Sequence, residues 1–256
     1  MMNYLSGFQK AVTWLAIGIF LVCEKPAFAS QITVKRQLIE HPRGIVEGTF
    51  ANGLHYIILP NELPRHDVEV RLVMRVGSLQ ENDRQKGSAH FLEHSAFTGT
   101  KHFPGHTLID YFERQGMKFG RDINAFTGFD RTIYWLSLPL EKTDSHVLDS
   151  AFLAVKDWLT AISFDSERVK KECSVIAEEL RGYSTGDDFY PLKIGKGRYA
   201  QRMPLGTEDD IRHIDSATLQ AFHSEWYAPQ LATVVVVGNI NAEKTVDMLQ
   251  RNLSSI

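Results

Sequence analysis

The chain has 256 residues, of which 43% are hydrophobic and 23% are charged, a balance typical of globular proteins rather than disordered or fibrous ones. Its 28 lysine and arginine residues and 31 aspartate and glutamate residues give a formal net charge of -3. No basic run is long enough to follow a phosphate backbone, so we do not expect nucleic acid as a partner.

The first 29 residues differ from the rest and predict a secretory signal peptide. Lys10 precedes an apolar run from Ala11 to Cys23, and Ala27-Phe28-Ala29 has the small-x-small pattern that signal peptidases cut. The alternative is a membrane anchor, but the run is shorter than the roughly 20 apolar residues of a span. We therefore expect an exported chain, periplasmic or secreted, with one mature domain over residues 30–256 and no membrane span in it.

The mature chain is predicted to begin with a hairpin and a strand. Asn52-Gly53 lies between two β-prone runs in residues 48–60, which is a strong hairpin signal. The next segment alternates apolar and polar residues, the pattern of a strand with one buried face. Its apolar members are Val68, Val70, Leu72, Met74 and Val76.

Helical patterns then alternate with further strands. We expect helices over residues 88–97, 107–115, 147–159, 166–181, 216–226 and 241–253, and strands over 131–139 and 233–237. An early hairpin followed by mixed strands and helices indicates an α+β fold. The predicted architecture is a two-layer α/β sandwich with a mostly antiparallel sheet packed against helices.

Residues 90–94 read His-Phe-Leu-Glu-His, the inverted zinc motif H-x-x-E-H. On a helix, residues four apart share one face, so the imidazoles of His90 and His94 can bind one metal ion. Glu93 is placed to take a proton from the attacking water, because zinc lowers the pKa of a bound water toward neutrality. The pattern alone leaves open two structural histidines beside a solvated glutamate.

A catalytic zinc site usually has three protein ligands, and the helix predicted over residues 166–181 offers the third. Val169, Glu172, Val175, Ile176, Glu179 and Leu180 fall on one stripe of that helix. Carboxylates in an apolar stripe indicate a cation partner, because burying an unpaired charge is costly. We therefore predict Glu179 as the third ligand and Glu172 as a carboxylate that orients a ligand or the substrate. Glu178 is the adjacent alternative, and a rotated stripe would leave both glutamates half exposed.

These segments resemble the M16 (pitrilysin or insulinase-like) zinc metallopeptidases over nearly the whole mature sequence. The resemblance is carried by Gly77-Ser78, residues 87–94 (GSAHFLEH), residues 97–100 (FTGT), residues 124–127 (NAFT) and residues 172–180 (ECSVIAEEL). In that family, two glutamates stand seven residues apart and the second binds zinc. The resemblance therefore implies one Zn²⁺ per chain, held by His90, His94 and Glu179.

The resemblance also implies endopeptidase cleavage of peptides or small unfolded polypeptides. Substrate would be held as an added strand along a sheet edge, a mode that reads extended backbone, with Asn124 and Ala125 as the candidate contacts. A turn role for Asn124 is an equal alternative. Family members enclose substrate with a second, similarly folded half, which we expect as a partner and which this sequence does not include. A non-catalytic subunit that binds peptide and closes a chamber is the competing interpretation.

Overall fold

The structure is a computed structural model that describes residues 44–61, 67–139, 145–184 and 195–256. The expected signal peptide and the start of the expected mature domain lie outside these residues. All of the described residues lie in the unit Pro42–Ile256, one of the two units into which the chain divides. None of the helices in the described ranges is long and apolar enough to cross a membrane.

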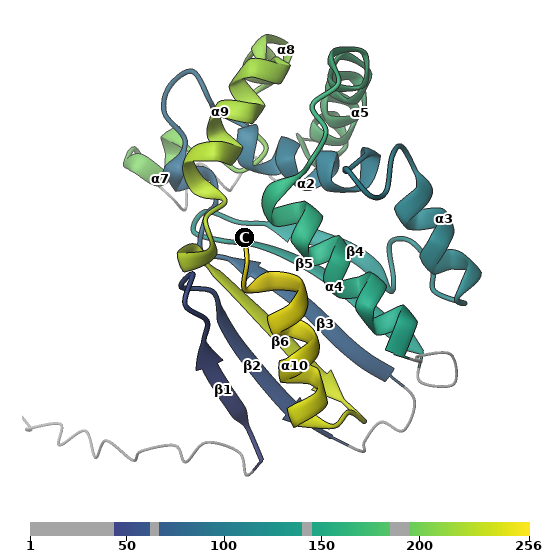
Figure 1. Cartoon of the computed structure of the whole chain (residues 1–256). Helices are drawn as coiled ribbons and strands as arrows, with labels where there is room; N and C mark the ends of the chain where they lie inside the picture. Colours follow the sequence, from purple (N-terminus) through teal and green to yellow (C-terminus); the bar gives the residue numbers. More distant parts are fainter. Residues whose placement is uncertain (1–43, 62–66, 140–144, 185–194) are drawn as a thin grey trace, which may run out of the picture. The chain divides into compact units, whose positions relative to one another are not determined.

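In the described residues, six strands form a single sheet in the order β1-β2-β6-β3-β5-β4 (Figure 1). Neighbouring strands are antiparallel except β2 and β6, which run parallel with Tyr56 opposite Val234. The prediction of a mostly antiparallel sheet is therefore confirmed. The strands are β1 (Val46–Thr49), β2 (His55–Pro60), β3 (Asp67–Met74), β4 (Ile123–Thr127), β5 (Thr132–Pro139) and β6 (Ala232–Gly238).

The predicted hairpin is β1 and β2, and its connection is residues 50–54 rather than a two-residue turn. The N–H of Gly53 bonds to the carbonyl of Phe50 at 2.8 Å, with Gly53 at φ 87°. The Asn52 amide donates instead to the carbonyl of Leu253 at 2.7 Å. Asn52 thus connects the hairpin to the helix that contains Leu253. Local turn preferences do not predict such a long-range contact.

Every predicted helix is present, with ends within a few residues of the expected ones. The helices are α2 (Ser88–Thr98), α3 (Thr107–Arg114), α4 (Ser145–Thr160), α5 (Ser166–Ser184), α7 (Arg198–Gln201), α8 (Glu208–His213), α9 (Ser216–Trp226) and α10 (Ala242–Leu253). Two short helices, α7 and α8, were not predicted. Thr207 and Asp210 form a capping box at the start of α8, a signal that the sequence did contain.

Alternation along the strands sets which face of the sheet is buried. In β3, β5 and β6 every second residue is buried, as the two-residue period of a strand requires. Figure 1 shows α4 and α10 lying across the sheet, and their apolar residues share one core cluster with the buried strand residues. Burial of each large apolar side chain contributes about 1.5–3 kcal/mol, so this layer supplies much of the stability.

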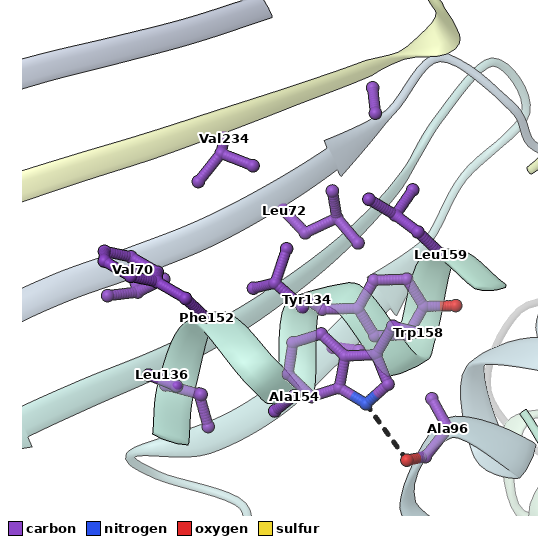
Figure 2. Close-up of a cluster of buried hydrophobic side chains, with 14 of the residues drawn as sticks. Val70, Leu72, Ala96, Tyr134, Leu136, Phe152, Ala154, Trp158, Leu159 and Val234 are labelled. Carbon is purple, nitrogen blue, oxygen red and sulfur yellow. Dashed lines mark hydrogen bonds between the residues drawn. The ribbon is translucent and has the colours of Figure 1, made fainter. Parts of the chain in front are cut away.

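Trp158 of α4 joins the core to helix α2. It is fully buried and stacks on Tyr134 of β5 with ring centroids 5.1 Å apart. Its indole N–H donates to the carbonyl of Ala96 at 3.0 Å, as Figure 2 shows. The helix that carries residues 90–94 is therefore fixed to the sheet through α4.

Candidate metal centre

Helix α2 begins at a glycine and is capped by a side chain from an earlier segment. Gly87, at the N-cap, has φ 85° and no side chain to accept the free N–H groups of the first turn. The buried carboxyl group of Glu81 takes that role, since its oxygens accept the N–H of Gly87 at 3.0 Å and that of Ala89 at 2.9 Å. Glu81 thereby fixes where the helix starts.

The other end of α2 is capped by two donors from later helices. Ala96 and Thr98 lie in its last turn, where carbonyls have no partner within the helix. Trp158 donates to the carbonyl of Ala96, and the Arg168 guanidinium of α5 donates to the carbonyl of Thr98 at 3.2 Å. Both ends of the motif helix are therefore set by tertiary contacts.

Helix α5 packs against α2 along the predicted stripe. Val169 and Ile176 are buried in a cluster that includes Phe91 of α2. The prediction that Val175 lies on the buried stripe was wrong, because this residue is 47% exposed. The contact face lies slightly to one side of the predicted stripe, and Cys173 is packed against the cluster instead.

This packing brings together three potential metal ligands, His90, His94 and Glu179 (the metal group). Their donor atoms lie within 4.8 Å of one another. Glu179 Oε2 lies 3.3 Å from His94 Nε2 and 3.7 Å from His90 Nε2. Zinc bonds to nitrogen and oxygen are about 2.0–2.2 Å long, so ligand atoms around a tetrahedral zinc stand about 3.3–3.6 Å apart. The Glu179–His94 distance lies in this range and the Glu179–His90 distance lies just above it, and two imidazole nitrogens with a carboxylate oxygen are a donor set that zinc accepts.

The two histidines differ in charge. Burial, followed by the charge of His94, lowers the pKa of His90 to about 4, so His90 is neutral and offers a nitrogen lone pair. Burial also lowers the pKa of His94, but hydrogen bonds to Glu172 and Glu179 outweigh it and raise the value to about 9. A proton on His94 thus compensates the two carboxylates when no cation is present, and a metal ion would displace it.

Glu172 lies behind His94 rather than among the three potential ligands. Its Oε1 is 2.8 Å from His94 Nδ1. A carboxylate in this position fixes the ring orientation and leaves Nε2 directed toward the metal group. The neighbouring Glu178, the alternative ligand, points away: its side chain is 71% exposed and pairs with Arg181 at 2.7 Å.

Glu93 faces strand β4. The hydroxyl of Thr127 donates a hydrogen bond to Glu93 Oε2. Burial raises the pKa of Glu93, and the Thr127 hydrogen bond opposes that shift. Glu93 is therefore a partly shielded carboxylate beside the metal group, with a higher proton affinity than one in water.

The candidate substrate contacts lie on the edge strand. β4 pairs only with β5 among the described strands, and Asn124 and Ala125 stand opposite Trp135 and Tyr134. The Asn124 side chain donates to the carbonyl of Gly120 at 2.8 Å and accepts the N–H of Ala125 at 2.8 Å. Asn124 therefore makes the local bonds of a turn residue while lying in the strand, and its role toward substrate stays a prediction.

The histidines that follow the motif do not join the metal group. His102 Nδ1 lies 2.7 Å from Asp157 Oδ1, and Asp157 is 1% exposed. His106 is exposed at the N-cap of α3. Asp157 also accepts the Thr100 hydroxyl at 2.6 Å, so this cluster holds the loop after α2.

Sequence reasoning missed two residues that support the site. Glu81 had a detectable signal, because a helix that begins at glycine requires an acceptor from elsewhere. Thr127 lay within a segment noted for its family resemblance, but nothing in its spacing indicates a bond to Glu93. That contact depends on how β4 is placed beside α2.

Comparison with known proteins identifies the family. Residues 56–189 match the family described as Insulinase (Peptidase family M16), and residues 213–256 match the Peptidase M16 inactive domain. The chain belongs to peptidase family M16. This confirms the resemblance proposed from the motif segments.

The M16 relatives include named zinc proteases. The probable zinc protease PqqL of Haemophilus influenzae is 38% identical over 215 residues, which cover 82% of this chain and 23% of that protein. The chloroplastic stromal processing peptidase of Pisum sativum is 31% identical over 224 residues, covering 84% of this chain and 17% of that protein. The chain thus spans less than a quarter of the length of these curated relatives.

A solved M16 structure has the same fold. The first half of the periplasmic protease PqqL from Escherichia coli superimposes with a TM-score of 0.78 at 34% identity, over 85% of this chain and 47% of that one. The α+β architecture predicted from the sequence is therefore that of M16 peptidases.

Proposed function

We propose that this chain carries the zinc site of an endopeptidase that hydrolyses peptides or small unfolded polypeptides. The observation that carries the proposal is the group formed by His90, His94 and Glu179, with Glu93 on the same helix as the two histidines. Its donor set suits zinc, and both Glu179–histidine distances are close to the spacing of ligands around a tetrahedral ion. The zinc protease names of the M16 relatives support the same class of activity.

One zinc ion per chain is expected, held by His90 Nε2, His94 Nε2 and a Glu179 oxygen. When bound, zinc would supply a Lewis acid that polarises the scissile carbonyl and makes water more acidic. Glu172 holds His94 in the orientation that this requires. Among the described residues, no fourth protein ligand joins the group, which supports an open catalytic site over a closed structural one.

Glu93 acts as the general base in this proposal. Its carboxylate removes a proton from the water that attacks the peptide carbonyl, and then delivers that proton to the leaving amine. The raised pKa of Glu93 brings its proton affinity closer to that of the groups with which it exchanges protons. A fully solvated carboxylate would be a weaker base.

The substrate is proposed to add as a strand along β4, in contact with Asn124 and Ala125. Backbone pairing of this kind binds extended chains with little dependence on side chains. In the structure, the Asn124 side chain accepts the N–H of Ala125. A peptide that pairs with that N–H would displace Asn124, and the released amide could then bind the peptide itself.

We further propose export through a signal peptide in residues 1–29, to the periplasm or beyond, and pairing with a second M16-like half. The periplasmic location stated for PqqL of Escherichia coli supports export, and the greater length of the relatives supports the second half. The competing function is a non-catalytic subunit that binds peptide. Possession of the zinc donors and of Glu93 favours the catalytic role.

The test is zinc content and hydrolysis of a quenched, unstructured peptide by the chain, beside the variants Glu93→Gln, Glu179→Gln and Glu178→Gln. We expect bound zinc in the wild type and in Glu93→Gln, but cleavage only in the wild type. Glu179→Gln should lose zinc, whereas the adjacent exposed Glu178→Gln should keep both properties. Absence of zinc from the wild type would overturn the metallopeptidase function, and zinc with cleavage that persists in Glu93→Gln would overturn the role of the base.

A further inference from the structure

We propose that Thr127 is a positioning residue for Glu93, whose hydroxyl holds one carboxylate oxygen so that the other is free to meet water and substrate. This inference rests on the proposed function, in which Glu93 is the general base. It concerns the orientation of the base rather than its identity.

The contact itself is specific. Thr127 Oγ1 donates to Glu93 Oε2, and Thr127 is 7% exposed. Within the described part of the chain, no other group donates a hydrogen bond to the Glu93 carboxylate. One oxygen is thus committed to Thr127, and Oε1 remains available for proton transfer.

The hydroxyl is held by the sheet and not by a loose loop. Thr127 is the last residue of β4 and stands opposite Thr132 of β5. The next residue, Gly128, donates its N–H to the carbonyl of Arg131 at 2.8 Å, and the Thr132 hydroxyl donates to the carbonyl of Val76 at 3.0 Å. A donor on such a support keeps the carboxylate within the narrow range of orientations that catalysis requires.

The location on β4 links substrate binding to the base. Ala125 and Thr127 are two residues apart on the edge strand and are both buried, so they share one face. The strand proposed to hold the substrate backbone is therefore also the strand that holds Glu93. A substrate seated on β4 is placed in a fixed relation to the carboxylate that acts on it.

The test compares Thr127→Val, which keeps the β-branched shape and removes the hydroxyl, with Thr127→Ser, which keeps the hydroxyl. In the zinc-loaded chain with a quenched unstructured peptide, we expect Thr127→Val to lower kcat about 10- to 100-fold, the range for losing a hydrogen bond to a charged group. KM and zinc content should not change, and Thr127→Ser should recover most of the rate. Crystal structures of both variants without zinc should show the Glu93 carboxylate rotated in Thr127→Val and in its original place in Thr127→Ser.

Each contrary outcome overturns the inference. An unchanged carboxylate position in Thr127→Val, or an unchanged kcat, would show that the hydroxyl does not orient the base. Equal losses in both variants would assign the effect to the methyl group, and loss of zinc from Thr127→Val would assign it to the integrity of the metal group. A failure of the proposed function is distinguishable, because it would appear as absent zinc in the wild type or as activity retained by Glu93→Gln.

Discussion

Replacing Glu81 by glutamine tests how the start of helix α2 is held. The Glu81 side chain is 2% exposed, and its oxygens accept the N–H groups of Gly87 and Ala89. Burial raises the pKa of this carboxyl from 4.5 to about 8, although the two backbone N–H groups and the charge of Arg202 oppose the shift. The folded chain therefore keeps a proton that the unfolded chain releases at a lower pH.

The sign of the effect follows from that difference. The stabilisation from the retained proton is complete below the unfolded pKa and is lost as the pH rises through the folded pKa, about 8. At about 1.4 kcal/mol for each pH unit, the loss approaches ~5 kcal/mol as an upper limit. The variant Glu81→Gln has no such proton. The wild type should therefore lose stability relative to the variant as the pH rises from weakly acidic to weakly alkaline.

The assay is urea unfolding of the metal-free wild type and variant at several pH values, followed by tryptophan fluorescence. Taking the difference between the two proteins removes the contribution of every other titrating group. The exposed Glu113→Gln on α3 serves as the matched control, because it removes one carboxyl group without touching the start of α2. A wild type whose advantage over Glu81→Gln stays constant, or grows with pH, would refute the reasoning and show that Glu81 is ionised in the folded chain.

Three further changes test other parts of the site. Glu172→Gln should lower zinc affinity about 10- to 100-fold with unchanged stoichiometry in chelator competition; equal affinity would mean that Glu172 does not support His94. Trp158→Phe should reduce the free energy of unfolding by about 1–3 kcal/mol, because the carbonyl of Ala96 loses its donor. Asp157→Asn should lower the free energy of unfolding by about 1–3 kcal/mol, because its buried hydrogen bonds with Thr100 and His102 are weakened. The exposed Asp110→Asn should change it by less than about 0.5 kcal/mol. Urea unfolding measures each change, and stabilities equal to that of the wild type would contradict the roles given to Trp158 and Asp157.

Local patterns were sufficient to predict most elements and the meeting of His90, His94 and Glu179. The strand alternation at Val68 to Val76 and the helical stripe from Val147 to Leu159 are each set by one buried face, so period alone identifies them. His90, His94 and Glu179 were predicted for a related reason. Two histidines on one helical face and a carboxylate within an apolar stripe are local signals of a shared cation.

Contacts between distant segments could not be predicted in this way. The exposure of Val175 depends on the angle at which α5 meets α2, and the bond from Thr127 to Glu93 depends on the position of β4. Glu81 shows an intermediate case, because the need for an acceptor at Gly87 is visible locally but its source is not. Such interactions depend on how distant segments pack together, and local sequence patterns carry no signal for that.

The position of β6 has a consequence for how the molecule is made. Residues 232–238 form a strand that lies between β2 and β3, and all the proposed zinc and catalytic residues precede it in the chain. Until β6 is synthesised, the hairpin β1-β2 and the strands β3, β5 and β4 each leave open the edge that β6 later fills, in addition to the outer edges at β1 and β4. Open edges of this kind invite pairing with other chains. Insertion of this one valine-rich strand therefore joins two half-sheets into one and closes both of those edges.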